Sequence, residues 1–193
     1  MDEDLKLVNQ ILKGNLDSFN ILVNKYEFPV LKFVYNMVKN KEAAEDISQE
    51  VFITVYKKVY TFNPEYKFSS WLFQVARNKC IDYMRKYKRV YEASIEEVKE
   101  VYSTDMSPET SAEYMETKLQ LQGFVNRLES LDREILILRY SENLTFMDIA
   151  EILNINEATV KRRYYKIRDK YKAIYTLDEA RCNLWIAAFS KII

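Results

Sequence analysis

The side chains best suited to chemistry in this sequence are cations gathered on one short stretch. Residues 157–172 hold the acids Glu157 and Asp169 against seven bases: Lys161, Arg162, Arg163, Lys166, Arg168, Lys170 and Lys172. A helix of this composition fits the major groove of DNA and the phosphates beside it. The alternative is a helical hairpin whose charged outer face is simply solvated, because lysine and arginine are usually exposed.

The residues around this stretch predict a helix-turn-helix over 146–172. Thr145 and Asp148 are three residues apart and form a capping box ahead of an apolar run. Asn154 can adopt the left-handed conformation that ends a first helix, and Asn156 suits the N-cap of a second. These signals together favour DNA binding over a solvated hairpin.

A second candidate nucleic-acid surface follows an aromatic-rich loop at residues 62–70, which we expect to end in a serine N-cap. On the predicted helix 71–87, Trp71, Asn78 and Arg85 share one face. Aromatic rings stack on unpaired bases, amides read base edges and cations hold phosphates. The alternative is that the aromatic side chains here are ordinary core residues.

A third surface is predicted on the helix spanning 42–59. Ile47, Val51, Val55 and Val59 recur every fourth residue and should face a core. The opposite face carries Asp46, Gln49, Glu50 and Ile53. Taken by itself, such a face is expected to be solvated.

The composition favours an all-α fold. The 193 residues are 48% hydrophobic but contain only two glycines and three prolines. Lysine plus arginine and aspartate plus glutamate number 29 each, so the formal net charge is zero. The charges are nevertheless segregated, because two basic stretches flank an acidic one. We therefore expect two small helical domains joined by a flexible acidic linker: 1–91, linker 92–112 and 113–176, with a C-terminal amphipathic helix at 177–193.

Several classes of protein have little support in this sequence. There is no histidine, and Cys80 and Cys182 lie far apart, so we expect reduced thiols, no metal site and no cofactor. No secretory signal opens the chain and no run of about 20 apolar residues could span a bilayer. The expectation is a cytoplasmic protein with no membrane span and no small-molecule substrate.

Three segments together resemble the extracytoplasmic-function (group IV) sigma factors of the sigma-70 family. Residues 44–52 (AEDISQEVF) look like the region 2 helix that docks on RNA polymerase. Residues 68–78 (FSSWLFQVARN) are similar to the promoter-melting segment of that family. Residues 131–140, followed by the helix-turn-helix, look like region 4. The likeness covers residues 5–172, with the segments in the family's order.

The resemblance implies a role for each surface. Core polymerase would be bound through its beta-prime clamp helices and beta flap, with the clamp helices contacting Asp46, Gln49, Glu50 and Ile53. The minus-10 promoter element would be held by Asn63, Lys67, Phe68, Trp71, Asn78 and Arg85. The minus-35 element would be read by Lys161, Arg162, Arg163, Tyr165 and Lys166. The resemblance also implies an anti-sigma partner and a chain that is not itself an enzyme.

Two other functions are compatible with parts of the sequence. A stand-alone helix-turn-helix regulator would dimerise on a palindromic duplex with half-sites about one helical turn apart. A recombinase or similar nucleic-acid enzyme lacks support, because no phosphate-cradling glycine loop or carboxylate cluster is present. The leading prediction is a dissociable polymerase subunit that selects promoters and helps to melt DNA.

Overall fold

The computed structural model describes residues 3–93, 120–121, 123–142 and 144–175. Within these ranges every regular element is a helix, which confirms the all-α prediction. The predicted C-terminal helix at 177–193 and nearly all of the predicted acidic linker lie outside the described residues. The domain boundaries proposed from the sequence stay predictions.

The first part of the chain forms a bundle, called here the N-terminal bundle. It comprises α1 (Glu3–Leu12), α2 (Leu16–Val38), α3 (Lys41–Lys58), the 3₁₀ turn η1 (Val59–Thr61) and α4 (Phe68–Ala93). The side chains of Asn15 and Asn40 cap α2 and α3 by accepting bonds from backbone amides three residues on. As predicted, Ile47, Val51, Val55 and Val59 are buried and hold α3 against the core.

One prediction about the helices of this bundle was wrong. The helix expected to start at Trp71 begins at Phe68 instead, so Ser70 is a buried residue inside α4 and not its N-cap. A proline such as Pro29 is expected either to start a new helix or to kink an existing one, and here α2 continues through it. Apolar contacts on both sides of Pro29 favour continuity, since Tyr26, Val30 and Phe33 all face the core.

The second part of the chain forms the C-terminal bundle. It comprises helical residues within 120–126, then α6 (Ser130–Ser141), α7 (Phe146–Leu153) and α8 (Glu157–Tyr175). Ile135, Leu136 and Leu138 of α6 are fully buried, as predicted for a helix that packs under the helix-turn-helix. From the sequence we expect Asp132 to cap a helix over 133–140, but α6 starts at Ser130 and places Asp132 within its first turn.

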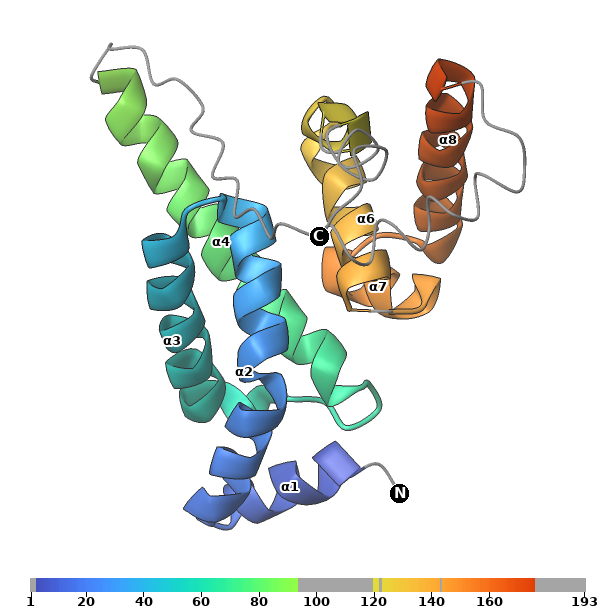
Figure 1. The fold of residues 1–193 in the computed structure, drawn as a ribbon. Coiled ribbons are helices and arrows are strands. Elements are labelled where there is room, and N and C mark those ends of the chain that lie inside the picture. Colours follow the sequence, from blue (N-terminus) through green and yellow to red (C-terminus); the bar gives the residue numbers. More distant parts are fainter. Residues whose placement is uncertain (1–2, 94–119, 122, 143, 176–193) are drawn as a thin grey trace, which may run out of the picture.

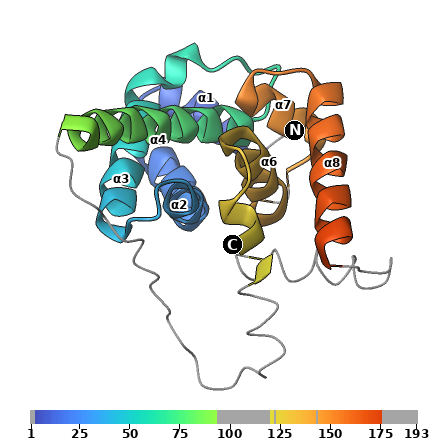
Figure 2. The same cartoon turned by 90° about the horizontal axis from the view of Figure 1, so that it is seen from above.

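The two bundles pack against each other (Figures 1 and 2). The first turns of α4 lie beside α7, and α2 lies beside α6. Figure 2 shows α4 running across the N-terminal bundle towards α6 and α7, with α8 on the far side of them. The contact therefore joins the helix expected to bind the minus-10 element to the first helix of the helix-turn-helix.

Cys80 is the described free cysteine, and it is buried in α4. Burial, reinforced by the negative charge of Glu134, raises the pKa of its thiol to about 12. At pH 8 the reactive thiolate is then only about one part in 10,000 of the thiol. In a Cys182→Ser variant, native protein should therefore resist iodoacetamide under conditions that fully alkylate the urea-unfolded chain, as measured by mass spectrometry. Labelling at the unfolded rate would show that α4 opens readily.

Candidate nucleic-acid interface and protein-binding groove

The solvent-facing side of α3 lies along a groove between α2 and α3. The groove has a volume of about 630 Å³ and is lined by apolar side chains that include Phe19, Val23, Leu31 and Phe52. Of the four residues predicted to bind polymerase, Gln49 and Ile53 line this groove, and Asp46 and Glu50 are exposed on the same helix. Ile53 is 53% exposed and lies beside the other apolar residues of the groove, so it adds to a contiguous apolar surface of the kind that a partner covers.

Charged groups border this apolar surface. Glu27, Glu45 and Lys57 also line the groove. Glu50 accepts a hydrogen bond from Lys79 of α4 at 2.9 Å, so part of its charge is neutralised within the bundle. An apolar trough with an acidic border fits an amphipathic partner helix that carries basic residues.

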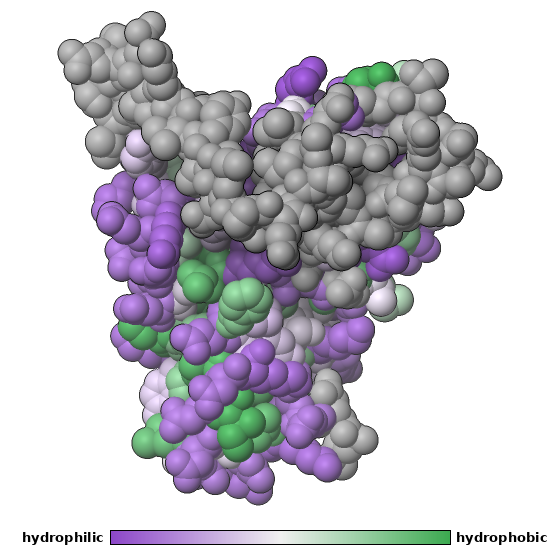
Figure 3. All heavy atoms as spheres, viewed as in Figure 1, coloured by the Kyte–Doolittle hydropathy of each residue, from purple (hydrophilic) through white to green (hydrophobic). Residues whose placement is uncertain are grey.

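Other apolar side chains reach the surface at the end of the bundle where α1 meets α2. Figure 3 shows a mostly hydrophilic face on which apolar side chains gather where α1 and the start of α2 lie. Leu12 and Leu16, at the ends of these two helices, are 51% and 58% exposed. Neither of them is among the residues that line the groove beside α3.

Trp71 lies at the start of α4 on an aromatic platform. Its ring centroid is 5.8 Å from that of Phe62 and 5.9 Å from that of Phe68. Phe62 and Phe68 are buried, whereas Trp71 keeps part of its surface exposed. The core interpretation of the aromatic residues therefore holds for the two phenylalanines. Phe68 packs against the indole of Trp71, and because it is buried its own ring is not accessible to DNA.

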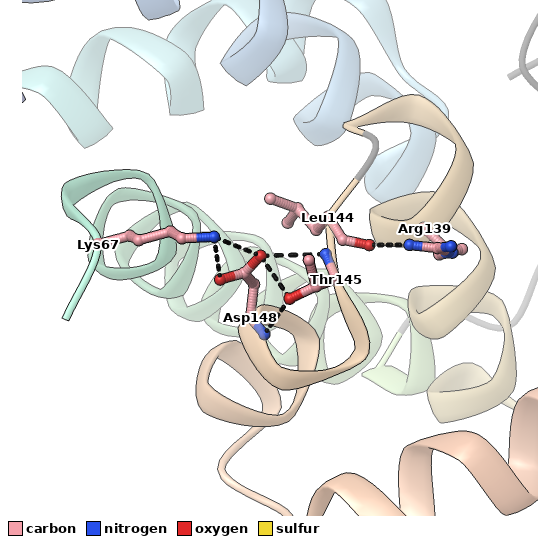
Figure 4. A network of polar contacts seen from close by, with 5 residues as sticks. All are labelled: Lys67, Arg139, Leu144, Thr145 and Asp148. Atoms are coloured by element: carbon pink, nitrogen blue, oxygen red, sulfur yellow. Dashed lines mark hydrogen bonds and ion pairs between the residues drawn. The ribbon is translucent and has the colours of Figure 1, made fainter. Parts of the chain in front are cut away.

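The polar candidates beside Trp71 are differently placed. Asn63 is exposed, and its side chain bonds both the backbone amide and the carboxylate of Glu65, which fixes the loop before α4. Asn78 and Arg85 are exposed further along α4. Lys67 points towards Asp148 of the C-terminal bundle (Figure 4).

The helix-turn-helix has the local geometry that the sequence predicts. Thr145 accepts a bond from the Asp148 amide, and the Asp148 carboxylate accepts one from the Thr145 amide, which completes the capping box. Asn154 ends α7 in the left-handed conformation, with φ 54° and ψ 49°. The Asn156 side chain accepts a bond from the Ala158 amide at the start of α8. Buried Ile149, Leu153 and Val160 form an apolar seam between the two helices.

The outer face of α8 exposes most of the predicted minus-35 residues. Lys161, Arg162, Tyr165 and Lys166 are all exposed. Tyr165 is held in place by the guanidinium of Arg168, which lies 4.9 Å from the centre of its ring. This face presents cations together with one oriented phenol, a combination suited to phosphates and base edges.

Arg163 does not share this face. Its guanidinium donates to Asp132 of α6 at 2.7 Å and lies 3.4 Å from Glu129. The bond to Asp132 also raises the pKa of Arg163. Arg163 therefore joins α8 to α6, and the prediction that it reads DNA is not supported by its position.

A polar network connects the two bundles around Asp148 (Figure 4). The Lys67 amine lies 2.9 Å from Oδ1 and 3.1 Å from Oδ2 of Asp148, and Oδ2 also accepts bonds from the amide and the hydroxyl of Thr145. Burial alone would raise the pKa of Asp148, but the hydrogen bonds from Thr145 and Lys67 outweigh it and lower the pKa. Asp148 is thus a charged group that serves the capping box and the inter-bundle contact together.

A second ion pair crosses between the bundles. Arg77 of α4 donates to Glu134 of α6 at 2.6 Å, and the carboxylate of Glu134 also accepts a bond from Ser130. The Glu134 side chain is 5% exposed and that of Arg77 is 20% exposed. We call Lys67–Asp148 and Arg77–Glu134 the inter-bundle ion pairs.

Sequence reasoning missed the inter-bundle ion pairs. The partners are 81 residues apart in one pair and 57 in the other, and no periodicity links them. The sequence indicates only a local capping role for Asp148. Among the described residues, no group of acids and cysteines is placed to hold a metal ion. No helix in the described ranges is long and apolar enough to cross a bilayer.

Comparison with known proteins identifies the two halves of the chain. Residues 22–90 match the sigma-70 region 2 family and residues 118–170 match the sigma-70 region 4 family. The ECF RNA polymerase sigma factor SigW of Bacillus subtilis is 32% identical over 172 residues, which are 85% of this chain and 92% of the relative. SigM of the same organism is 34% identical over 150 residues, covering 78% and 90% of the two chains.

Solved structures agree on the fold. A complex of CnrH with the cytosolic domain of CnrY superimposes with a TM-score of 0.66 at 20% identity, covering 92% of this chain and 100% of that one. The sigma factor RpoE of Bartonella quintana, bound to the anti-sigma factor NepR, gives 0.59 at 20% identity over 82% of this chain and 98% of that one. A stand-alone regulator is not favoured, because the relatives match along both bundles. The chain belongs to the extracytoplasmic-function sigma factors of the sigma-70 family, which supply promoter recognition to RNA polymerase.

Proposed function

We propose that the three surfaces of this sigma factor divide the work of promoter recognition among them. The α3 face and its groove seat the chain on the clamp helices of core RNA polymerase. Trp71, with the loop before it and the exposed side of α4, captures unpaired bases of the minus-10 element. The exposed face of α8 reads the minus-35 duplex. Residues 1–91 and 113–176 then act as separate domains joined by the acidic linker 92–112.

The observation that supports this division most strongly is the groove beside Ile53. A protein that only bound DNA would have no use for an apolar groove bordered by exposed Gln49, whereas a dissociable polymerase subunit needs such a surface. The chain brings no active site of its own in this proposal, and the polymerase performs the chemistry in the cytoplasm. An anti-sigma protein would block the same surfaces in the resting cell.

The direct test is transcription in vitro with purified core polymerase, a library of genomic fragments and this protein. New transcript starts that depend on the protein are expected, each preceded by shared minus-10 and minus-35 sequences. No association with core polymerase and no new start would refute the proposal.

Replacing both Lys161 and Lys166 with alanine should weaken binding to a minus-35 duplex and make it less sensitive to salt. Both side chains are exposed on α8, although Lys161 is partly neutralised by Glu157 at 2.8 Å. For every phosphate that a lysine no longer neutralises, the slope of log K against log salt should become shallower by about 0.9. Fluorescence anisotropy across a salt series measures this slope. The matched control is the double variant Lys6→Ala with Lys13→Ala, which removes two exposed lysines at and next to α1. Equal effects of the two double variants would show only general charge attraction.

A further inference from the structure

We propose that Asp4 and Tyr26 are positioning residues for promoter opening, which hold the aromatic platform of Trp71 in the orientation that receives an unpaired base. Neither side chain touches DNA in this proposal. Asp4 lies in α1 and Tyr26 in α2, so the first helix of the chain gains a part in recognition of the minus-10 element. The proposal rests on the function proposed above for Trp71.

Asp4 is a buried acid at the start of α1. It is only 6% exposed, although it lies in the first turn of the helix. An acid in a first turn interacts favourably with the helix dipole even when it is fully solvated, so the dipole does not require burial. Burial of a carboxylate costs free energy unless hydrogen bonds and an opposite charge compensate for it. The burial of Asp4 therefore points to contacts that need a carboxylate at this position.

Two neighbouring residues of α2 make contacts of this kind. The hydroxyl of Tyr26 donates to Oδ2 of Asp4 at 2.5 Å, and the amine of Lys25 donates to Oδ1 at 2.5 Å. Tyr26 is buried, so its bond to Asp4 is shielded from water, whereas the side chain of Lys25 is 44% exposed. Hydrogen bonds to a charged acceptor are short and strong. Asp4 thus fixes the direction in which the Tyr26 side chain points.

The ring of Tyr26 carries this constraint to the platform. Its centroid lies 5.8 Å from that of Phe68, and the two ring planes are tilted by 56°. Phe68 in turn packs against Trp71 and Phe62, with centroid separations of 5.9 Å and 5.8 Å. Aromatic rings at these separations prefer tilted or edge-on contacts, and a close-packed interior transmits small displacements. A change in the direction of Tyr26 should therefore move the indole.

The helix that carries Asp4 also supports the loop that precedes Trp71. α1 packs against η1, the turn that leads into this loop. Figure 1 shows α1 at the foot of the bundle, below the loop that leads into α4. Val8 of α1 and Val59 of η1 are both buried. Attachment of α1 through Asp4 should therefore restrict the loop as well as the platform.

A second hydrogen bond between α1 and α2 provides a matched comparison. The hydroxyl of Ser18 in α2 donates to the side-chain oxygen of Gln10 in α1 at 2.6 Å, and Ser18 is buried. Both residues are close in the chain to the corner where α1 meets α2, and neither has a ring that could pass a constraint to Phe68. The two bonds therefore separate positioning of the platform from simple attachment of α1.

The test is promoter opening by the full chain with core polymerase, on a promoter recovered from the genomic library. Tyr26→Phe removes one hydroxyl and keeps the ring, and Asp4→Asn removes the charge and keeps the shape. Each should lower the permanganate-reactive fraction by about threefold to tenfold, while affinity for core polymerase stays within about twofold of wild type. Ser18→Ala also deletes one buried hydroxyl and should leave opening unchanged.

Two further readouts separate positioning from a loss of stability. In a Trp185→Phe background Trp71 is the only tryptophan, so acrylamide quenching reports the accessibility of its indole. Tyr26→Phe should raise the quenching constant, and Ser18→Ala should not. In a Trp71→Ala background Tyr26→Phe should reduce opening no further, because the side chain that it positions is gone. Circular dichroism checks that helix is retained; if Asp4→Asn unfolds, Tyr26→Phe carries the test.

Three results would overturn the positioning role. They are normal opening by Tyr26→Phe, an equal loss of opening with Ser18→Ala, and a further loss when Tyr26→Phe is added to Trp71→Ala. Failure of the proposed function has a different signature, because Trp71→Ala by itself would then open the promoter normally. The two failures are therefore distinguishable in one set of measurements.

Discussion

Replacing Ile53 with aspartate should lower the affinity of this sigma factor for core RNA polymerase by about tenfold to a hundredfold. Ile53 is 53% exposed in the free chain and lines the groove between α2 and α3. A partner helix in that groove would bury the isoleucine, and an aspartate in its place would lose that burial and take a charge into an apolar contact. Titration of labelled sigma factor with core polymerase measures the change.

The matched control for this variant is Ile21→Asp. Ile21 lies on α2, is 52% exposed, and is not among the residues that line the groove. Both substitutions add the same charge to a helix surface with nearly equal exposure, so a general loss of solubility or stability should affect both. Wild-type affinity for Ile53→Asp, or an equal loss for Ile21→Asp, would contradict the assignment of the α3 face.

The second large effect is expected from Trp71→Ala, which should reduce promoter opening by about fivefold to a hundredfold. Stacking of one unpaired base on an aromatic side chain stabilises the complex by about 1–3 kcal/mol. Flipping that base from the duplex costs a few kcal/mol. Without the stacking interaction this free-energy cost is no longer offset, so the opened complex is less populated. Permanganate reactivity of thymines near the transcript start measures the opened fraction.

Two comparisons separate stacking from packing in the Trp71 experiment. Trp71→Phe keeps an aromatic ring on the platform of Phe62 and Phe68 and should retain much of the opening activity. Binding to the minus-35 duplex should be unchanged in both variants, because α8 is untouched. Normal opening by Trp71→Ala would show that the indole serves only the core.

The two variants should fail at different steps of initiation. The Ile53 variant should fail at the first step, because the groove that it alters is the proposed contact with polymerase. The Trp71 variant should bind polymerase normally and fail only when the duplex opens.

The helix-turn-helix was predictable because its signals are local. The capping box of Thr145 and Asp148, the left-handed Asn154 and the cap at Asn156 each depend on hydrogen bonds within about one helical turn. The inward face of α3 was predictable for a related reason. Side chains four residues apart lie on the same side of a helix wherever that helix packs.

The positions of individual side chains depended on longer-range contacts. Arg163 has the composition and spacing of a DNA-reading residue, yet Asp132 lies close enough to bind it within the bundle. Phe68 is 2% exposed, because Tyr26 and Phe62 pack against its ring. A single sequence does not distinguish an exposed aromatic or cation from one whose partner comes from a distant helix.

The sequence by itself determined the helices, the basic face of α8 and the candidate polymerase face, since amphipathic spacing and capping act over a few residues. Only the tertiary structure decided that Lys67 meets Asp148 and that Arg77 meets Glu134. Those contacts follow from how the two bundles fit together. Their partners lie many residues apart, where neither helical period nor turn chemistry carries information.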